Sequence, residues 1–202
     1  ADNKMHGSLS DEFGKLDALL KLDLANNHIS GLGEGVCTLR YLTRLQLRNN
    51  KLKGLPDNIG GLTGLVELDA SHNQISEIPE SVGAMSQLKR LDLSVNCIER
   101  TPSSLCGLQS LRYLFLSHNN IHHIAGRIGR LAELRKLCLD HNEITSAGLW
   151  DGQIDKMTSL THLSIGWNKI DVLRASTFDP PPPILEVLDV RHNMLSKLPD
   201  SV

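Results

Sequence analysis

Aromatic residues are scarce in this chain, and long hydrophobic runs are missing. Aromatic side chains make up 3% of the 202 residues, although hydrophobic residues make up 40%. A core with so few rings must consist mainly of leucine and isoleucine side chains. No hydrophobic run approaches the roughly 20 residues that a helix needs to cross a bilayer, and no signal peptide opens the chain. We therefore expect a protein without a membrane span.

An excess of charge of either sign is also missing. Lys and Arg together number 21 and Asp and Glu number 23, which gives a formal net charge of −2. A chain with this balance has no bulk electrostatic attraction to nucleic acid or to an anionic membrane surface. The composition therefore argues against nucleic acid as the partner.

Paired cysteines and glycosylation acceptors are missing as well. The four cysteines, Cys37, Cys97, Cys106 and Cys138, lie far apart and never in C-x-x-C spacing. None of the asparagines stands in an N-x-S/T sequence. Both features favour a reducing compartment, so we predict an intracellular, cytoplasmic location. Cys37 and Cys106 replace a glycine of a repeated segment, and we expect them to be small, half-buried residues and not reactive thiols.

What the chain has is a repeat. The copy from Leu88 to Ile98 follows the pattern L-x-x-L-x-L-x-x-N-x-I. Five steps of 23 residues between successive copies, such as 42 − 19, are followed by one of 26 (160 − 134) and one of 25 (185 − 160). The eight copies, here called units one to eight, begin at Leu19, Leu42, Leu65, Leu88, Leu111, Leu134, Leu160 and Leu185.

The pattern predicts short strands that stack on one another. In L-x-L, two leucines alternate with an outward residue, which is the period of a half-buried strand. A strand this short cannot bury its apolar face alone, but stacked copies make a continuous core. The asparagine of each copy should satisfy backbone groups where the chain leaves the strand. This structural asparagine ladder comprises Asn27, Asn50, Asn73, Asn96, Asn119, Asn142, Asn168 and Asn193.

The repeat resembles that of the leucine-rich repeat family over nearly the whole chain. Return segments such as Leu55-Pro56…Ile59-Gly60…Leu62 resemble the intracellular Ras-group class, which includes scribble- and erbin-like scaffolds. The resemblance implies an α/β fold. Its form would be a leucine-rich repeat solenoid, a curved horseshoe with short parallel strands on the concave face and 3₁₀ or helical turns on the convex face. It also implies a scaffold that binds proteins in intracellular signalling.

We expect residues 1–202 to form a single leucine-rich repeat domain. Residues 3–16 match the second part of a repeat whose strand is missing, and the last residues stop within a return segment. This reading predicts a segment of a longer protein. Pro180–Pro183 should be extended, because four prolines in a row favour polyproline geometry. We interpret that run as a stiff spacer.

The outward strand positions differ between the two halves of the chain. In units one to four they are mostly charged, and we interpret their aspartates as solvated strand positions. In units five to seven they collect most of the rings of an otherwise ring-poor sequence. Exposed rings on a rigid surface are typical of binding hot spots. The predicted partner-binding residues are Tyr113, Phe115, His118, Cys138, His141, His162 and Trp167.

Other chemistries fit these residues less well. Two neighbouring histidines and Cys138 could hold zinc, but no paired short-range spacing supports a tetrahedral site. Catalysis by Cys138 and His141 would need a water-excluding site with an oxyanion hole, which an open strand face does not offer. We predict no metal, no cofactor and no enzymatic activity. A basic group is interleaved with acidic residues and should be a solvated face; it comprises Lys89, Arg90, Arg112, Arg127, Arg130, Arg135 and Lys136.

The sequence therefore predicts a protein–protein interaction module that binds its partner on the concave face. The main alternative is a regulatory segment of a larger signalling enzyme, such as a kinase, a GTPase or a phosphatase. A nucleic-acid-binding chain would show an affinity that falls steeply with salt. An extracellular receptor is a fourth reading, because Gly7–Phe13 is somewhat similar to plant receptor repeats.

Overall fold

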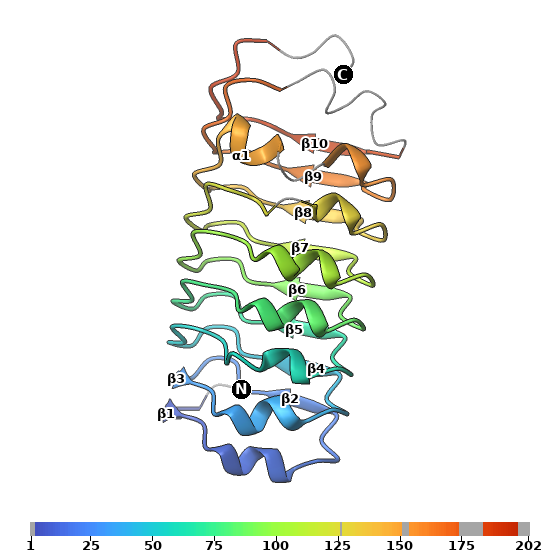
Figure 1. Cartoon of the computed structure of the whole chain (residues 1–202). Coiled ribbons are helices and arrows are strands. Elements are labelled where there is room, and N and C mark those ends of the chain that lie inside the picture. The colour runs from blue at the N-terminus through green and yellow to red at the C-terminus, as the bar shows by residue number, and fades with distance from the viewer. Residues whose placement is uncertain (1–2, 126, 151–153, 174–183, 198–202) are drawn as a thin grey trace.

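A parallel sheet of eight short strands runs along the whole length of the molecule (Figure 1). The computed structural model describes residues 3–125, 127–150, 154–173 and 184–197. Each unit contributes one strand of three residues, whose middle leucine points into the core. The strands are β2 (Lys21–Asp23), β4 (Arg44–Gln46), β5 (Glu67–Asp69), β6 (Arg90–Asp92), β7 (Tyr113–Phe115), β8 (Lys136–Cys138), β9 (His162–Ser164) and β10 (Val187–Asp189).

The strands pair in sequence order and in constant register. Leu45 pairs with Leu68, and Leu68 pairs with Leu91, so equivalent positions of successive units lie side by side. The longer sixth and seventh units keep this register, because Leu163 still pairs with both Leu137 and Leu188. The added length of these units therefore does not change the pairing of the strands.

The return segments form a layer of short helices on the other side of the core (Figure 1). Most of these helices are 3₁₀ turns, which suit a short return better than a full α-helix does. They are η1 (Asp11–Lys15), η2 (Glu34–Thr38), η3 (Ile59–Gly61), η4 (Glu80–Ala84), η5 (Ser103–Gly107), η6 (Ile128–Arg130) and η7 (Ile154–Lys156). The lengthened sixth return adds a short α-helix, α1 (Ser146–Trp150). The predicted solenoid of parallel strands and helical turns is confirmed.

A second, two-stranded sheet lies in the first repeats. Strand β1 (His6–Ser8) pairs in parallel with β3 (His28–Gly31). The peptide N–H of Met5 also donates to the side-chain oxygen of Asn27 at 3.1 Å. Residues 3–16 thus occupy the place of a return segment beside unit one, as the alignment of the repeats indicates.

The core consists of stacked columns of leucine and isoleucine. The middle leucines of the strands, from Leu45 to Leu137, are 0% exposed, and so are the first leucines from Leu42 to Leu160. Successive return segments approach closely at glycine: a Cβ on Gly60 would lie 2.1 Å from the carbonyl oxygen of Ser81. Cys37 stands at the equivalent position of an earlier return and is fully buried, not half-buried as predicted. Burial raises the pKa of its thiol to about 12.

An asparagine side chain joins each unit to the one before it. The amide of Asn119 donates to the carbonyl oxygens of Leu93 and Leu116, both at 3.0 Å. Its side-chain oxygen accepts from the peptide N–H of Ile98, also at 3.0 Å. The asparagine of every unit accepts an equivalent hydrogen bond from a peptide N–H of the preceding repeat. This bond satisfies an N–H group that has no partner in the sheet. We call these eight residues the inner column; they are Asn27, Asn50, Asn73, Asn96, Asn119, Asn142, Asn168 and Asn193.

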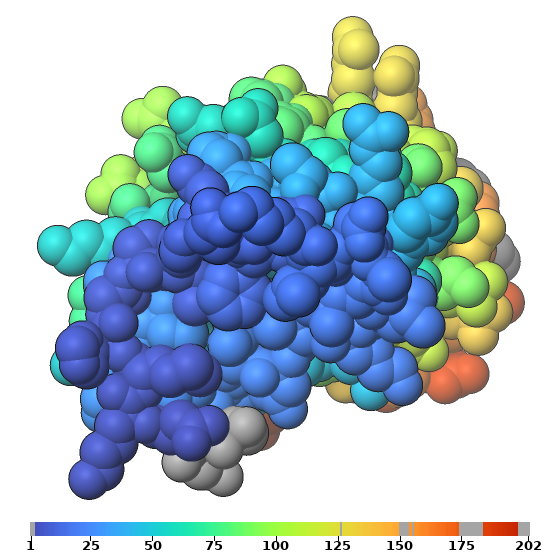
Figure 2. All heavy atoms as spheres, turned by 90° about the horizontal axis from the view of Figure 1, so that it is seen from below, coloured from blue at the N-terminus to red at the C-terminus, as the bar shows by residue number. Residues whose placement is uncertain are grey.

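Strands β2 and β10, from the first and the last unit, lie at opposite ends of the sheet (Figure 1). Seen from its N-terminal end, the molecule presents residues of the first repeats, with later units stacked behind them (Figure 2). Leu16 and Leu20 belong to this part of the chain and stay 50% and 58% exposed. Within the described residues, no helix is both long enough and apolar enough to cross a membrane. The proline run Pro180–Pro183 lies outside the described residues.

Candidate functional site

The outward positions of the strands form a continuous surface, which we call the strand face. In every strand two side chains flank the buried leucine and point away from the core, because strand side chains alternate. In β7 these are Tyr113 and Phe115, which flank Leu114. Their register neighbours in β8 are Lys136 and Cys138, so four residues from two strands lie together. His162 of β9 continues the row beside Lys136.

The two aromatic side chains of β7 differ in how accessible they are. Tyr113 is 38% exposed, whereas Phe115 is half-buried. The guanidinium carbon of Arg90 lies 4.3 Å from the centre of the Phe115 ring, and the Lys136 ammonium lies 5.8 Å from it. Such cation–π contacts hold the cations over the ring. A partner would therefore meet Tyr113 and two positioned cations before it met Phe115.

A second feature is a stack of four rings just beyond the strand ends. His118 and His141 lie 4.1 Å apart between ring centres, with an angle of 11° between their planes. Trp167 stacks on His141 at 4.4 Å, and His192 stacks on Trp167 at 4.5 Å. His192 was not among the predicted site residues, although it stands in the same repeat position. We call these four residues the ring stack.

The ring stack belongs to a column whose backbone is unusual. The residue before each asparagine of the inner column has φ between 49° and 57°, in the left-handed region. Asn and His tolerate this conformation better than most residues, whereas β-branched Val95 is an exception. We call this the outer column; it comprises Asn26, Asn49, His72, Val95, His118, His141, Trp167 and His192.

The shared backbone explains why the rings are parallel. Residues with the same φ leave the chain in the same direction, and neighbouring units are about 5 Å apart, close to a stacking distance. In the first half of the molecule the column carries asparagines instead, and Asn49 donates to Asn26 at 2.9 Å. Burial, together with the nearby charge of His118, lowers the pKa of His141. The stacked ring of His141 is therefore neutral over a wider pH range than a free histidine.

Cys138 does not have the surroundings of a catalytic thiol. Burial raises its pKa to about 11, so the thiol stays protonated and weakly nucleophilic at neutral pH.

The Nδ1 atom of His162 lies 2.9 Å from the hydroxyl of Thr161. Within the described part of the chain, no group of three or more His, Cys, Asp or Glu residues is placed to hold a metal ion.

The strand aspartates have a structural role. Asp92 is 7% exposed and accepts hydrogen bonds from the N–H and the hydroxyl of Ser94, at 3.1 and 2.7 Å. Its other oxygen pairs with Arg90 at 2.9 Å. Asp69 and Ser71 repeat the arrangement one unit earlier. The interpretation of the aspartates as solvated positions is therefore wrong for Asp92, whose carboxylate fixes the turn after the strand.

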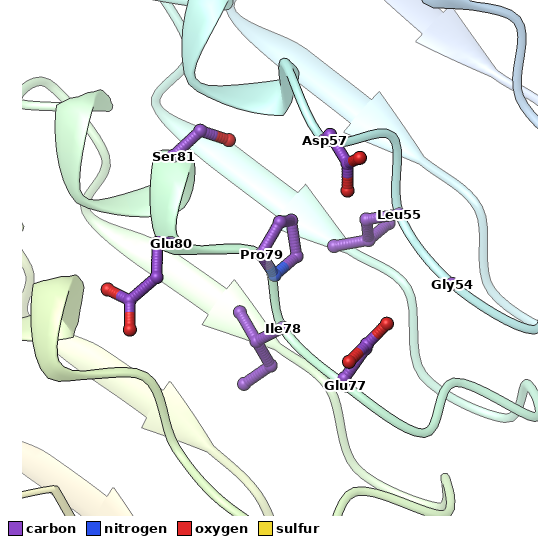
Figure 3. A pocket seen from close by; sticks show the side chains of 8 residues that line it. All are labelled: Gly54, Leu55, Asp57, Glu77, Ile78, Pro79, Glu80 and Ser81. Carbon is purple, nitrogen blue, oxygen red and sulfur yellow. The ribbon is translucent and has the colours of Figure 1, made fainter.

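Three hollows in the described residues lie away from the predicted residues, and one of them, of about 430 Å³, is beside Lys15 to Leu19 at the N-terminal end of the stack. A second, of about 370 Å³, is on the strand face of units one and two, where it is lined by residues that include Asp23, Arg44 and Arg48. The third, of about 510 Å³, lies between two return segments (Figure 3). Figure 3 shows Asp57 and Glu77 on one side of it and Glu80 on the other.

Glu80 is already engaged within the fold. Its carboxylate accepts from the N–H groups of Ser103 and Ser104, at 3.3 and 2.9 Å. Hydrogen bonding with the side chain and backbone of Ser104, and then with Ser103, lowers the pKa of Glu80. The hollow between the return segments therefore contains acidic residues that do not converge on one point. The strand face of units four to seven, together with the ring stack, remains the best candidate site.

The predicted site residues fall into two groups. Tyr113, Phe115, Cys138 and His162 lie on three adjacent strands. His118, His141 and Trp167 lie in the ring stack. The repeat spacing places equivalent residues side by side, but it does not give their rotamers. The cations over Phe115 and the parallel rings could therefore not be read from the sequence.

Two protein-family models match this chain, and both describe leucine-rich repeats. A leucine rich repeat family model matches residues 17–75, 75–121 and 101–144, and a second leucine rich repeat model matches residues 156–172. No curated protein matches the chain significantly.

This chain spans half or less of the length of the similar solved structures described here. The plant peptide hormone receptor RGFR1, solved in complex with RGF2, is 27% identical over 96% of this chain, with a TM-score of 0.85. The ectodomain of the receptor kinase GASSHO1/SCHENGEN3 from Arabidopsis thaliana, in complex with CASPARIAN STRIP INTEGRITY FACTOR 2, is 30% identical over 98% of the chain, with a TM-score of 0.79. This chain covers 32% and 24% of those two chains. An internalin from Listeria monocytogenes, 23% identical over 89% of this chain and 50% of its own, shares the fold with a TM-score of 0.72.

Proposed function

The chain belongs to the leucine-rich repeat family, and we propose that it binds a polypeptide partner on the strand face of units four to seven. One observation carries the proposal: Tyr113 and the cations beside Phe115 are held in fixed register by neighbouring strands. A preorganised surface loses little entropy when a partner binds. The two plant receptors above were solved in complex with their partners, which supports a polypeptide ligand. No catalytic role is part of this proposal.

The test compares two double variants of the chain. The chain is used as bait, and a captured partner is then titrated against Tyr113→Ala with Phe115→Ala. We expect this variant to lose more than about 1 kcal/mol of binding free energy, the scale of a hot-spot residue. The matched control, Asp23→Ala with Gln46→Ala, alters the strand face of units one and two. Circular dichroism of both variants verifies the fold.

The two variants separate the candidate surfaces. Loss of binding in the control variant alone would place the partner on units one and two, beside the hollow that Asp23 lines. Equal binding by all three proteins would contradict a strand-face site.

A second candidate is that this chain is the regulatory segment of a larger signalling enzyme. The observation in its favour is that the GASSHO1/SCHENGEN3 protein is a receptor kinase and that this chain spans 24% of the solved part. Sequencing the complete reading frame tests it. A kinase, GTPase or phosphatase domain in the same frame would support the candidate, and its absence would remove it.

We also propose a reducing, intracellular setting of the kind used by the Ras-group class. All four cysteines are free thiols in the structure, and Cys97 is exposed. An exposed thiol persists where glutathione keeps it reduced. The test is maleimide labelling of the protein from acid-quenched cells. Labelling of Cys97 without prior reduction supports the proposal, and labelling only after reduction contradicts it.

A further inference from the structure

Three cations stand in line along the edge of the strand face. The N–H of Arg112 donates to the carbonyl oxygen of Lys89 at 2.9 Å, and the N–H of Arg135 donates to that of Arg112 at 2.9 Å. Hydrogen-bonded parallel strands are about 4.8 Å apart, so the three backbones span about 10 Å. We call Lys89, Arg112 and Arg135 the basic row. It ends at Val66 on one side and Thr161 on the other, which are its hydrogen-bonded neighbours.

Most of the positive charge of this region is not neutralised. Within the described residues, Lys89, Arg135 and Lys136 form no ion pair, and the first two are exposed. Arg112 pairs with Glu133 at 3.2 Å, but both side chains are substantially solvated. Water therefore screens this ion pair, and it is only weakly attractive.

The nearby carboxylates are already engaged. Asp92 holds the Ser94 turn and pairs with Arg90. Asp140 accepts from the N–H of Gly166 at 3.0 Å and from the hydroxyls of Ser117 and Ser164. The region therefore has unpaired cations, whereas its carboxylates already have partners. It is suited to a negatively charged ligand.

We propose that the partner docks an extended acidic segment across the strands, with its carboxylates on the basic row and a side chain against Tyr113. This inference rests on the proposed strand-face function and names the chemistry of its partner. In an extended chain, alternate side chains are about 7 Å apart, so two carboxylates fit within the 10 Å row. Tyr113 lies on the strand that follows Arg112 and supplies apolar contact beside the charges.

A polypeptide fits this region better than a nucleic acid does. The row is only three residues long, so it can neutralise few phosphates. Nucleic-acid affinity depends on the number of phosphates that are neutralised.

The experiment uses defined probes and the whole chain. The first probe is a fluorescein-labelled twelve-residue peptide in which Glu alternates with Thr around a central Tyr. Its twin replaces each Glu with Gln, and the third probe is labelled dodecathymidylate. Fluorescence anisotropy is measured with the parent and with two triple variants. The row variant carries Lys89→Gln, Arg112→Gln and Arg135→Gln together. The control variant carries Arg40→Gln, Lys51→Gln and Lys53→Gln together. The control removes the same charge from exposed positions outside the row.

We expect the acidic peptide to bind the parent at least about tenfold more tightly than the Gln twin or the oligonucleotide. The row variant should weaken its binding at least about tenfold, whereas the control should change it less than about twofold. Equal binding of the two peptides, equal loss in both variants, or tighter binding of dodecathymidylate would each overturn the inference.

The result is separable from that of the proposed function. If a captured partner depends on Tyr113 and Phe115 but tolerates the row variant, the acidic-segment inference fails and the strand-face function stands. If the row variant loses the acidic peptide while the captured partner tolerates the Tyr113 and Phe115 substitutions, the proposed function of that site fails.

Discussion

The inner and outer columns consist of adjacent residues, yet they obey different constraints. Every inner residue is asparagine, whereas the outer column contains asparagine, histidine, valine and tryptophan. The inner side chain makes hydrogen bonds to two units at once, as Asn119 does with Leu93 and Leu116. The outer side chain points outward, and only its backbone conformation is common to all units.

The difference teaches where this solenoid can vary without losing its fold. A position that satisfies buried backbone groups accepts one type of side chain, because an amide must both donate and accept there. A position that is constrained only in φ accepts several types at a modest cost in strain. Substitution of an outward side chain therefore costs least stability one residue before the asparagine that joins the units.

The largest expected effect is at the inner column. Asn119→Leu leaves the N–H of Ile98 without its partner. It also removes one of two side-chain hydrogen bonds from the carbonyl oxygens of Leu93 and Leu116, which keep those from Asn96 and Asn142. An unsatisfied buried N–H costs about 1–3 kcal/mol, and the two carbonyl oxygens each lose one hydrogen bond as well, so we expect about 2–3 kcal/mol of destabilisation. Urea unfolding gives the free energy of unfolding.

The matched control lies one residue earlier. His118→Asn replaces an outer residue by one that tolerates positive φ, and we expect a change within about 0.5 kcal/mol. Equal effects of Asn119→Leu and His118→Asn would show that the two columns do not differ in the way described above.

A smaller effect of opposite sign is expected in the outer column at Val95. This β-branched residue has φ of 55°, a conformation that favours Asn. Val95→Asn should therefore raise the free energy of unfolding by about 1 kcal/mol. Val172→Asn is the control, because Val172 is also exposed but does not have positive φ. Similar changes at both positions would show that replacing an exposed valine by a polar side chain has this effect without any relief of backbone strain.

The smallest effect is the pH dependence of the ring stack. Burial lowers the pKa of His141 in the folded state, so the unfolded chain binds this proton more tightly. The stability that His141 contributes is therefore fully present above its unfolded pKa of about 6.5, and it is lost as the pH falls from there through the lower pKa of the folded state. Urea unfolding between pH 7.5 and 5.5 should show a shallower pH dependence for His141→Gln than for the parent. An identical slope for the two proteins would remove the stack as a source of pH sensitivity.

Most of the fold follows from the period of the sequence. A repeat of 23 residues brings equivalent residues side by side, and the register of Leu45 with Leu68 follows from it. The 3₁₀ returns follow from segments too short for longer helices. The pairing of β1 with β3 was not predicted, because these residues lack the alternation of a half-buried strand and are mostly exposed.

Less of the candidate site could be predicted. The columns show that Phe115 follows Asp92 and precedes Cys138 in the stack, but they do not show that Arg90 and Lys136 turn over the ring. Rotamers depend on neighbours in three dimensions, and a repeat pattern gives only their order. The enrichment of Asn and His before the inner asparagines was a readable signal of positive φ that the strand interpretation missed.

The lengthened returns show that the spacing and register of the strands do not depend on the length of each return segment. The 26-residue step from Leu134 to Leu160 inserts α1, yet Lys136 still pairs with His162. Foreign sequence spliced into the return around Ser146–Trp150 should leave the neighbouring strands in place. A whole additional unit should lengthen the face by one strand spacing of about 4.8 Å.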